Sequence, residues 1–199
     1  MLDRTVRSSS LIRKRDFAAL LSDRRGLLEA AHYPAQVAAI VAAIVVAFKA
    51  GKKVLWFGNG GSAADAQHLA AEFSGRFWLE RPALPSEALS VNTSALTAIG
   101  NDYGFERLFS RQVEAYAAPG DVVIGLTTSG NSPNIVAGLE EGKRRGAVAI
   151  AFTGNGGGKV AQVADFVLLG PDGYSALVQE VHIALGHIIC DLVEQELFA

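Results

Sequence analysis

VLWFGNGGS at Val54–Ser62 and VVIGLTTSGNS at Val122–Ser132 are the two stretches that decide the fold. Each begins as an apolar run with strand character, continues as a loop rich in Gly, Asn and hydroxyl side chains, and leads into an apolar-periodic helical segment. A loop that turns into a helix N-terminus presents unpaired backbone N–H groups and the positive end of the helix dipole. Ser and Thr hydroxyls add donors that suit phosphate oxygens, and glycine lets the backbone approach a ligand closely. The two loops therefore predict a site for a phosphorylated small molecule.

Strands and helices are expected to alternate around these loops. Strands are expected over 53–58, 87–91, 121–127, 147–153 and 166–169. Helices are expected over 16–31, 34–50, 62–74, 105–117, 133–145, 159–163 and 175–197. Strands that are apolar throughout are typical of a parallel sheet covered on both faces. The prediction is an α/β fold, a three-layer α/β/α sandwich with a central five-stranded parallel sheet, with ligands beyond the carboxyl ends of the strands.

Length and charge limit the classes of protein. The 199 residues predict an N-terminal extension and helix over 1–33 and one domain over 34–199. The net charge of −2 argues against direct nucleic-acid binding, which usually needs a basic excess. Basic residues cluster only near the start, and we interpret them as part of a solvated extension: Arg4, Arg7, Arg13, Lys14 and Arg15.

The single cysteine and the hydropathy pattern bear on location. Cys190 has no partner for an intrachain disulfide, which fits a reducing cytoplasm. The most hydrophobic stretch, 37–48, is shorter than the about 20 residues of a membrane-spanning helix. It also lies too far from the N-terminus to be a signal peptide. We expect a cytoplasmic protein with no membrane partner.

A dinucleotide site is the first alternative to a compact phosphate site. Gly58–Ala63 fits the dinucleotide fingerprint loosely, with Ala63 in place of the last glycine. That fingerprint also needs an acidic residue at the end of the second strand, where this chain has Val91-Asn92-Thr93. The second hydroxyl loop suits one compact phosphate better, so nicotinamide or flavin binding is disfavoured.

His68 and Glu72 lie four residues apart on the helix expected after the first loop, so their side chains share a face. Such a pair can ligate one metal ion or place a base beside an acid; the alternative is an exposed pair without a role. Gln179 and His187 on the last helix are separated by about 12 Å of regular helix. Both reach one metal only if that helix begins late or bends, or if different subunits supply them.

Together the motifs resemble those of phosphoheptose isomerases. Over about residues 34–197, five motifs follow the order of that family: Gly58-Asn59-Gly60-Gly61-Ser62, Asp65-Ala66-Gln67-His68, Gly100-Asn101-Asp102, Thr128-Ser129-Gly130-Asn131-Ser132 and Gln179-Glu180-Val181-His182. These sugar isomerase (SIS) domain proteins convert sedoheptulose 7-phosphate to D-glycero-D-manno-heptose 7-phosphate. The resemblance implies the same aldose-ketose isomerisation through an enediol, in heptose biosynthesis for lipopolysaccharide or surface glycans.

The resemblance also implies which residues form the site. One zinc ion per subunit is implied at His68, Glu72, Gln179 and His187. Contacts to the sugar phosphate are implied at Asn59, Gly60, Gly61, Ser62, Arg76, Asn101, Asp102, Thr127, Thr128, Ser129, Ser132 and Gln179. Ala176 stands where some relatives have an acidic residue.

Moving a carbonyl between C1 and C2 needs a base that removes a proton beside the carbonyl and an acid that returns one. We expect Glu72 to handle the proton at one carbon and His187 to act as the shuttle. Zinc would polarise the carbonyl and stabilise the enediolate. A ligating Glu or His is less free to act as a base, so the division of roles stays open.

Two classes of SIS-domain protein remain to be compared, and both assemble as tetramers. Family members are homotetramers with active sites at subunit interfaces, and the apolar stretches 37–48 and 181–189 offer more helix surface than one small sheet covers. The alternative function is that of the replication initiator-associating protein, a SIS-domain tetramer that binds the bacterial initiator protein. That protein lacks acid and imidazole where this chain has Glu72 and His187, so the sequence favours the enzyme.

Overall fold

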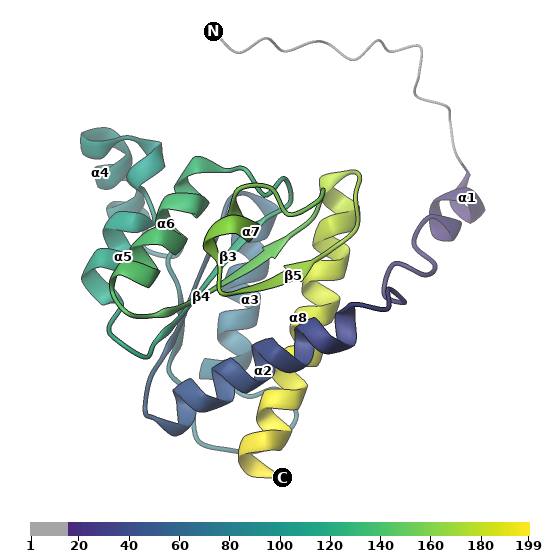
Figure 1. Cartoon of the computed structure of the whole chain (residues 1–199), viewed down its shortest axis with the longest axis horizontal. Coiled ribbons are helices and arrows are strands. Elements are labelled where there is room, and N and C mark those ends of the chain that lie inside the picture. The colour runs from purple at the N-terminus through teal and green to yellow at the C-terminus, as the bar shows by residue number, and fades with distance from the viewer. Residues whose placement is uncertain (1–15) are drawn as a thin grey trace, which may run out of the picture.

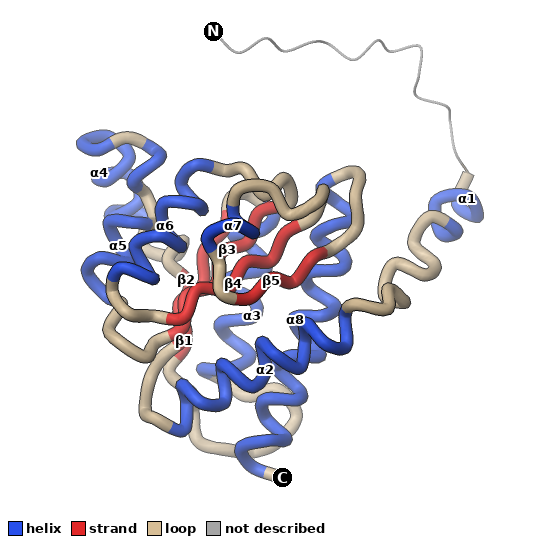
Figure 2. Tube along the Cα trace, viewed as in Figure 1, coloured by secondary structure: helices blue, strands red, loops and turns tan. Residues whose placement is uncertain are grey.

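The structure, a computed structural model, describes residues 16–199, so the basic residues Arg4, Arg7, Arg13, Lys14 and Arg15 lie outside the described part. Within residues 16–199 one parallel sheet of five strands has the order β2-β1-β3-β4-β5 (Figures 1 and 2). Its strands are β1 Val54–Gly58, β2 Ser86–Ala88, β3 Val122–Thr127, β4 Val148–Thr153 and β5 Phe166–Leu169. The expected five-stranded parallel sheet is confirmed.

Helices cover both faces of the sheet and complete the three layers. One face carries α2 (Tyr33–Lys49), α3 (Gly61–Ser74) and α8 (Ser175–Phe198). The other carries α5 (Ser110–Tyr116), α6 (Pro133–Arg144) and α7 (Val160–Val163). Alternate side chains of each strand enter opposite layers. Trp56 of β1 therefore packs near Phe73 of α3, whereas Phe57 stacks on Phe109 beside α5.

The strand order places both glycine-rich loops at one point of the sheet. β1 and β3 are neighbours, with Gly58 opposite Leu126, although β2 and the helices between them separate the two strands in the chain. Chain direction across the sheet reverses between β1 and β3, and ligands in open α/β sheets bind at such a switch point. The loops after β1 and β3 therefore face one shared crevice.

The N-terminal segment and the region after β2 differ from expectation. The helix expected over 16–31 is limited to α1 (Phe17–Ser22), because its side chains find no core to pack on and turns follow with Gly26 at φ +78°. The strand expected over 87–91 is shorter, and α4 (Thr93–Tyr103) follows it, with the Asn92 side chain capping its N-terminus. Every α4 residue is at least partly exposed, so this helix adds no buried side chain to the core.

Two further elements need comment. The helix expected over 105–117 is divided into the 3₁₀ turn η2 (Phe105–Arg107) and α5. α8 is long and apolar enough to pass for a membrane-spanning helix by length and composition alone. In this fold it is a core helix that packs along α2 and α3, and Val181, Ile189 and Val193 are buried there.

Candidate active site

Three hydroxyl groups gather in the loop after β3. The Thr127 Oγ1 lies 3.1 Å from the Ser132 Oγ and 3.4 Å from the Ser129 Oγ. Ser132 is the N-cap residue of α6, yet its side chain makes no capping hydrogen bond, so its hydroxyl is not committed to the helix. Hydroxyls beside a helix N-terminus are the arrangement expected for a phosphate site. The structure thus brings Thr127, Ser129 and Ser132 together as the sequence predicted.

The glycine cluster at 154–158 braces this loop. Gly130 has φ +69°, and a Cβ there would lie 2.2 Å from the Gly157 carbonyl oxygen. The Gly130 carbonyl also accepts from the Val160 N–H at 3.0 Å. Only glycine permits this close approach of two backbones at a left-handed residue. The cluster therefore holds the hydroxyl loop in place.

The loop after β1 is tied directly to the loop after β3. The side-chain amides of Asn59 and Asn134 exchange two hydrogen bonds, at 2.9 and 2.8 Å. Gly60 has φ +57° with open space where a Cβ would stand, and Ser62 is buried in the first turn of α3. Because Asn59 is already paired with Asn134, its first role is to join the two loops. Asn134 was not predicted. Its position directly after Ser132-Pro133, at the start of the expected helix, is the sequence feature that could have indicated it.

His68, Glu72 and His187 form the second half of the site. The His68 Nε2 lies 2.7 Å from the His187 Nε2 and 3.2 Å from a Glu72 carboxylate oxygen. One ligand atom from each of the three residues falls within 4.8 Å of the others. A single chain therefore brings these three residues together, through side-by-side packing of α3 and α8. Two imidazole nitrogens and a carboxylate oxygen that converge in this way fit a zinc site with an open position.

Gln179 lies at the other end of the α3–α8 contact. A Cβ at Gly61 would stand 2.7 Å from the Gln179 Nε2 and 2.8 Å from its Oε1, so the amide packs directly on the glycine loop. α8 is one continuous helix over both Gln179 and His187, and about 12 Å of helix rise separates them. Gln179 is thus placed beside the predicted phosphate loops, and its part in a zinc site stays a prediction.

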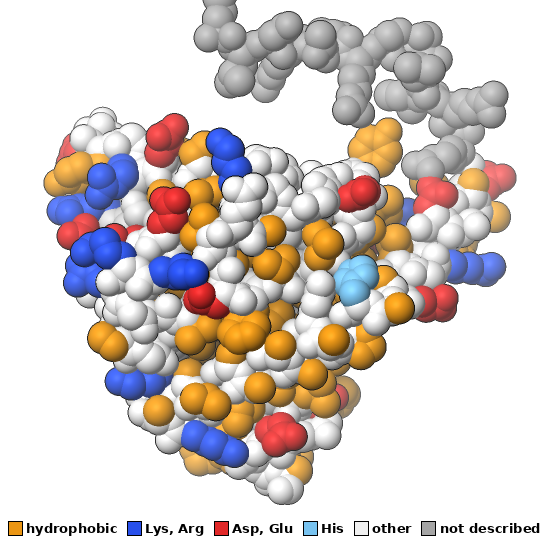
Figure 3. All heavy atoms as spheres, in the orientation of Figure 1, with side chains coloured by type: hydrophobic (Ala, Val, Ile, Leu, Met, Phe, Trp, Pro, Cys, Tyr) orange, Lys and Arg blue, Asp and Glu red, His pale blue; other side chains and the backbone are white. Residues whose placement is uncertain are grey.

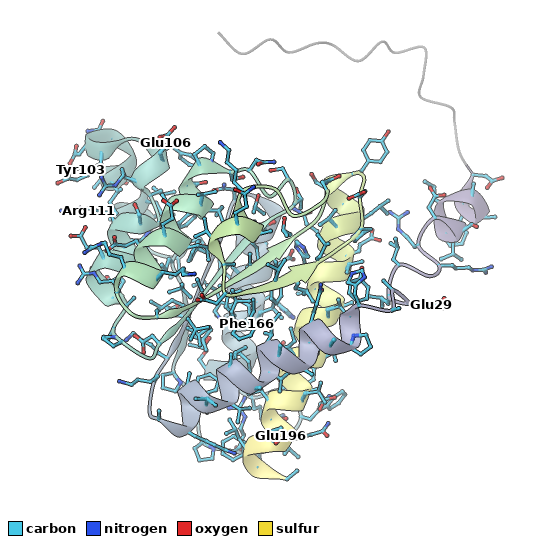
Figure 4. All side chains as sticks on the ribbon, in the orientation of Figure 1. Glu29, Tyr103, Glu106, Arg111, Phe166 and Glu196 are labelled. Atoms are coloured by element: carbon cyan, nitrogen blue, oxygen red, sulfur yellow. The ribbon has the colours of Figure 1, made fainter. Side chains whose placement is uncertain are left out.

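The remaining expected contacts lie apart from these loops. Arg76 is exposed and pairs loosely with Glu80, at 3.6 Å. Asn101 donates to Asp102 at the end of α4, a helix that packs mainly on η2. Figure 4 labels Tyr103, next to this pair, at the corner of the molecule opposite α8, where Tyr103 stacks with Arg111. Within one chain, substrate contacts of Asn101 and Asp102 stay predictions.

Three residues near the crevice were not among the predicted site residues. Ser175, the first residue of α8, places its hydroxyl 3.0 Å from that of Thr128. Asn155 donates to the Thr128 carbonyl and accepts from the Gly173 N–H, and both Ser175 and Asn155 line a cavity of about 500 Å³. Asp65 has one buried carboxylate oxygen with no hydrogen-bond partner within residues 16–199. Burial raises the pKa of the Asp65 carboxyl, and nearby His68 partly opposes that shift.

Comparison with known proteins agrees with this geometry. The sheet and loops are those of a SIS domain, whose family model matches residues 25–154. The chain is 56% identical to a phosphoheptose isomerase from Aquifex aeolicus, over 82% of this chain and 85% of the relative. It is 50% identical to one from Burkholderia pseudomallei, over 93% and 90%. The structure of a phosphoheptose isomerase from Neisseria gonorrhoeae matches with a TM-score of 0.83 and 39% identity, over 89% of this chain and 96% of that one. The chain therefore belongs to the phosphoheptose isomerase family.

Proposed function

We propose that this protein is an aldose-ketose isomerase that converts sedoheptulose 7-phosphate to D-glycero-D-manno-heptose 7-phosphate in heptose biosynthesis. Membership of the phosphoheptose isomerase family supports the reaction. The observation that carries it is the convergence of His68, Glu72 and His187 on one point, beside the helix that begins at the first glycine-rich loop. An acid and imidazoles are the groups that proton transfer between neighbouring carbons needs.

The proton transfers are assigned to Glu72 and His187. Glu72 takes the proton from the carbon beside the carbonyl, which leaves an enediol, and a proton is then delivered to the neighbouring carbon. His187 moves the proton between the two oxygens, and its Nε2 lies 2.7 Å from the Nε2 of His68. The His68 ring is exposed, so the cluster lies within reach of a substrate.

Zinc is the proposed metal, held by His68, Glu72 and His187 with Gln179 as the fourth member. When bound, it supplies a Lewis acid that polarises the substrate carbonyl. The donor set supports this assignment, because nitrogen and carboxylate ligands in tetrahedral arrangement suit zinc. Gln179 needs a change of side-chain position, or a partner subunit, to join the other three.

The phosphate is proposed to bind at Ser62, Thr127, Thr128, Ser129 and Ser132, with Asn59, Gly60 and Gly61 beside it. Backbone N–H groups at the starts of α3 and α6 supply the remaining donors. Arg76, Asn101, Asp102 and Gln179 are proposed to contact the sugar.

A cytoplasmic homotetramer with active sites at subunit interfaces is the proposed assembly. An apolar groove between α2 and α8 supports it, with two adjoining cavities of about 530 and 460 Å³ that share Ala38 and Leu192. Figure 3 shows hydrophobic side chains gathered over α2, and Glu29 and Glu196, labelled in Figure 4, border the two cavities. Surfaces of this kind mark interfaces.

The test is turnover by two variants of the purified protein. Glu72→Gln and His187→Ala should each lower kcat for sedoheptulose 7-phosphate by at least a hundred-fold, about the contribution of a positioned acid or base. Both side chains are only half-buried, so circular dichroism and the midpoint of thermal unfolding should stay near those of the unaltered protein. Near-normal turnover in either variant would contradict the assignment.

A further inference from the structure

Arg81 and Glu194 form an ion pair in the interior. It lies next to the cluster of His68, Glu72 and His187 but is not part of that cluster. The Arg81 Nε lies 2.8 Å from the Glu194 Oε1, and the two side chains are 1% and 2% exposed. Taking both charges out of water is costly, and a buried ion pair is by itself weak evidence for stability. The hydrogen bonds that the two groups make with the surrounding backbone therefore have to explain its presence.

Arg81 closes the end of α3. Its guanidinium donates to the carbonyl oxygens of Glu72 at 2.8 Å and of Phe73 at 2.9 Å. The last carbonyls of an α-helix have no partner within the helix, and here the planar guanidinium supplies one. One of these carbonyls belongs to Glu72 itself. The backbone of the proposed catalytic carboxylate is thus fixed by Arg81.

Glu194 fixes the segment that follows α3. Its carboxylate accepts from the backbone N–H groups of Phe77, Trp78 and Leu79 at 3.2, 2.7 and 2.8 Å. Burial alone would raise the pKa of Glu194, but these N–H donors and Arg81 lower it, so the carboxylate is kept ionised. Four donors on one buried carboxylate hold this segment against α8.

The ion pair is also connected to His187, through α8 and through the segment that follows α3. Glu194 follows His187 by two turns of that helix, so the two side chains lie on the same face, toward α3. The Phe77 ring, on the segment that Glu194 holds, lies 5.7 Å from the His187 ring. One ion pair therefore contacts the backbone of Glu72 on one side and the segment that packs on His187 on the other.

We propose that Arg81 and Glu194 are positioning residues that set the placement of Glu72 and His187, and with it the chemical step and the affinity for zinc. The inference rests on the proposed function. Groups that orient metal ligands typically change metal affinity or activity by 10–100-fold when they are altered. The phosphate loops lie at the opposite end of α3, so phosphate binding should depend on the pair little. Arg76, a proposed sugar contact, directly precedes the segment that Glu194 holds, so a change in KM smaller than the change in kcat is expected.

The test compares Glu194→Gln and Arg81→Lys with Glu141→Gln as the matched control. Gln keeps the shape of Glu194 but replaces one acceptor oxygen with a donor that faces N–H groups. Lys keeps the charge of Arg81 but cannot reach Glu194 and both carbonyls at once. Glu141 lies on α6, across the sheet from the cluster, and accepts from Arg144 and from the C-cap residue Arg145. We measure kcat and KM for sedoheptulose 7-phosphate, the midpoint of thermal unfolding, and the affinity of metal-free protein for Zn²⁺ by competition with a chelating indicator.

Both variants should lose at least ten-fold in kcat and at least ten-fold in Zn²⁺ affinity, with a smaller factor of change in KM, whereas Glu141→Gln stays within two-fold throughout. If Glu194→Gln fails to fold, Arg81→Lys decides by the same criteria. A lower unfolding midpoint with unchanged kcat, KM and Zn²⁺ affinity would show a purely structural pair and overturn the proposal. So would a raised KM with unchanged kcat. Absence of both turnover and Zn²⁺ binding in the unaltered protein would instead contradict the proposed function.

Discussion

At the scale of single residues, His182 shows how a buried imidazole differs from those of the site. It is fully buried on α8, and its Nε2 donates to the Thr153 carbonyl oxygen at 3.1 Å. Its Nδ1 has no hydrogen-bond partner within the described part of the chain. Burial lowers the pKa of His182 to about 4, although the bond to Thr153 favours the charged form. The ring is therefore neutral in the folded protein.

This burial predicts acid sensitivity. The unfolded chain binds a proton at His182 below its ordinary pKa of 6.5, whereas the folded chain does so only near 4. The stabilisation is fully present above pH 6.5 and is lost as the pH falls toward 4, by about 1.4 kcal/mol per pH unit. Between pH 6.5 and 5, the free energy of unfolding of the unaltered protein should fall by about 2 kcal/mol more than that of His182→Gln. Urea unfolding of both proteins at one fixed protein concentration measures this difference. Identical pH profiles for the two proteins would contradict this.

Residue chemistry was predictable where it follows a local pattern. The hydroxyls of Thr127, Ser129 and Ser132 follow one strand directly, so their meeting could be read from the sequence. The approach of His187 to His68 depends on how α8 packs on α3, and spacing along one helix cannot show that. Asn134, Asn155 and Arg81 make contacts between segments that are distant in the chain, and the local sequence does not show which segments meet.

At the scale of elements, the contact between α3 and α8 decides the geometry of the cluster. A Cβ at Gly186 would lie 2.6 Å from the Leu69 Cδ1, so glycine allows the two helices to come this close. Gly186 directly precedes His187, and Leu69 directly follows His68. The two imidazoles meet because the helices touch beside them.

Gly186→Ala should therefore disturb both stability and catalysis. Overpacking of this kind costs about 1–3 kcal/mol, and displacement of α8 separates His187 from His68. The matched control is Gly142→Ala on α6, where a Cβ would lie 2.3 Å from the Val123 Cγ2 on the other face of the sheet. It should lose stability but keep kcat. Leu69→Ala added to Gly186→Ala should cost less than the sum of the single changes; strict additivity in this cycle would count against the contact.

The elements themselves were largely predictable from hydrophobic pattern. The strands β1, β3, β4 and β5 are apolar runs, and their expected ranges match within a residue. β1 and β3 are wholly buried, whereas in β5 only Leu168 is. α1 lies inside the helix expected over 16–31, which ends earlier than predicted, whereas α4 was not predicted. Every residue of both helices is at least partly exposed. The division between 1–33 and 34–199 stays a prediction.

At the scale of the whole molecule, no segment within residues 16–199 covers the groove between α2 and α8. Hydrophobic side chains over α2 are exposed on this face (Figure 3). Val46 lines the groove and is 68% exposed, so Val46→Glu should leave the folded chain intact. In an assembly formed across this groove, the same change buries a carboxylate against apolar surface, which is strongly unfavourable. Light scattering should show a smaller mass for Val46→Glu than for the unaltered protein. The control is Tyr116→Glu on α5, which should keep the original mass. An unchanged mass for Val46→Glu would place the interface elsewhere.

The central claim is tested most directly by following sedoheptulose 7-phosphate with the purified protein in D₂O by proton NMR. The account predicts conversion to the aldose with solvent deuterium at C2, because an enediol formed at an exposed cluster exchanges its proton with water. Treatment with a chelator should slow the conversion, and added Zn²⁺ should restore it. The contradicting result is no conversion of sedoheptulose 7-phosphate, with or without Zn²⁺, even when the protein is as concentrated as the substrate.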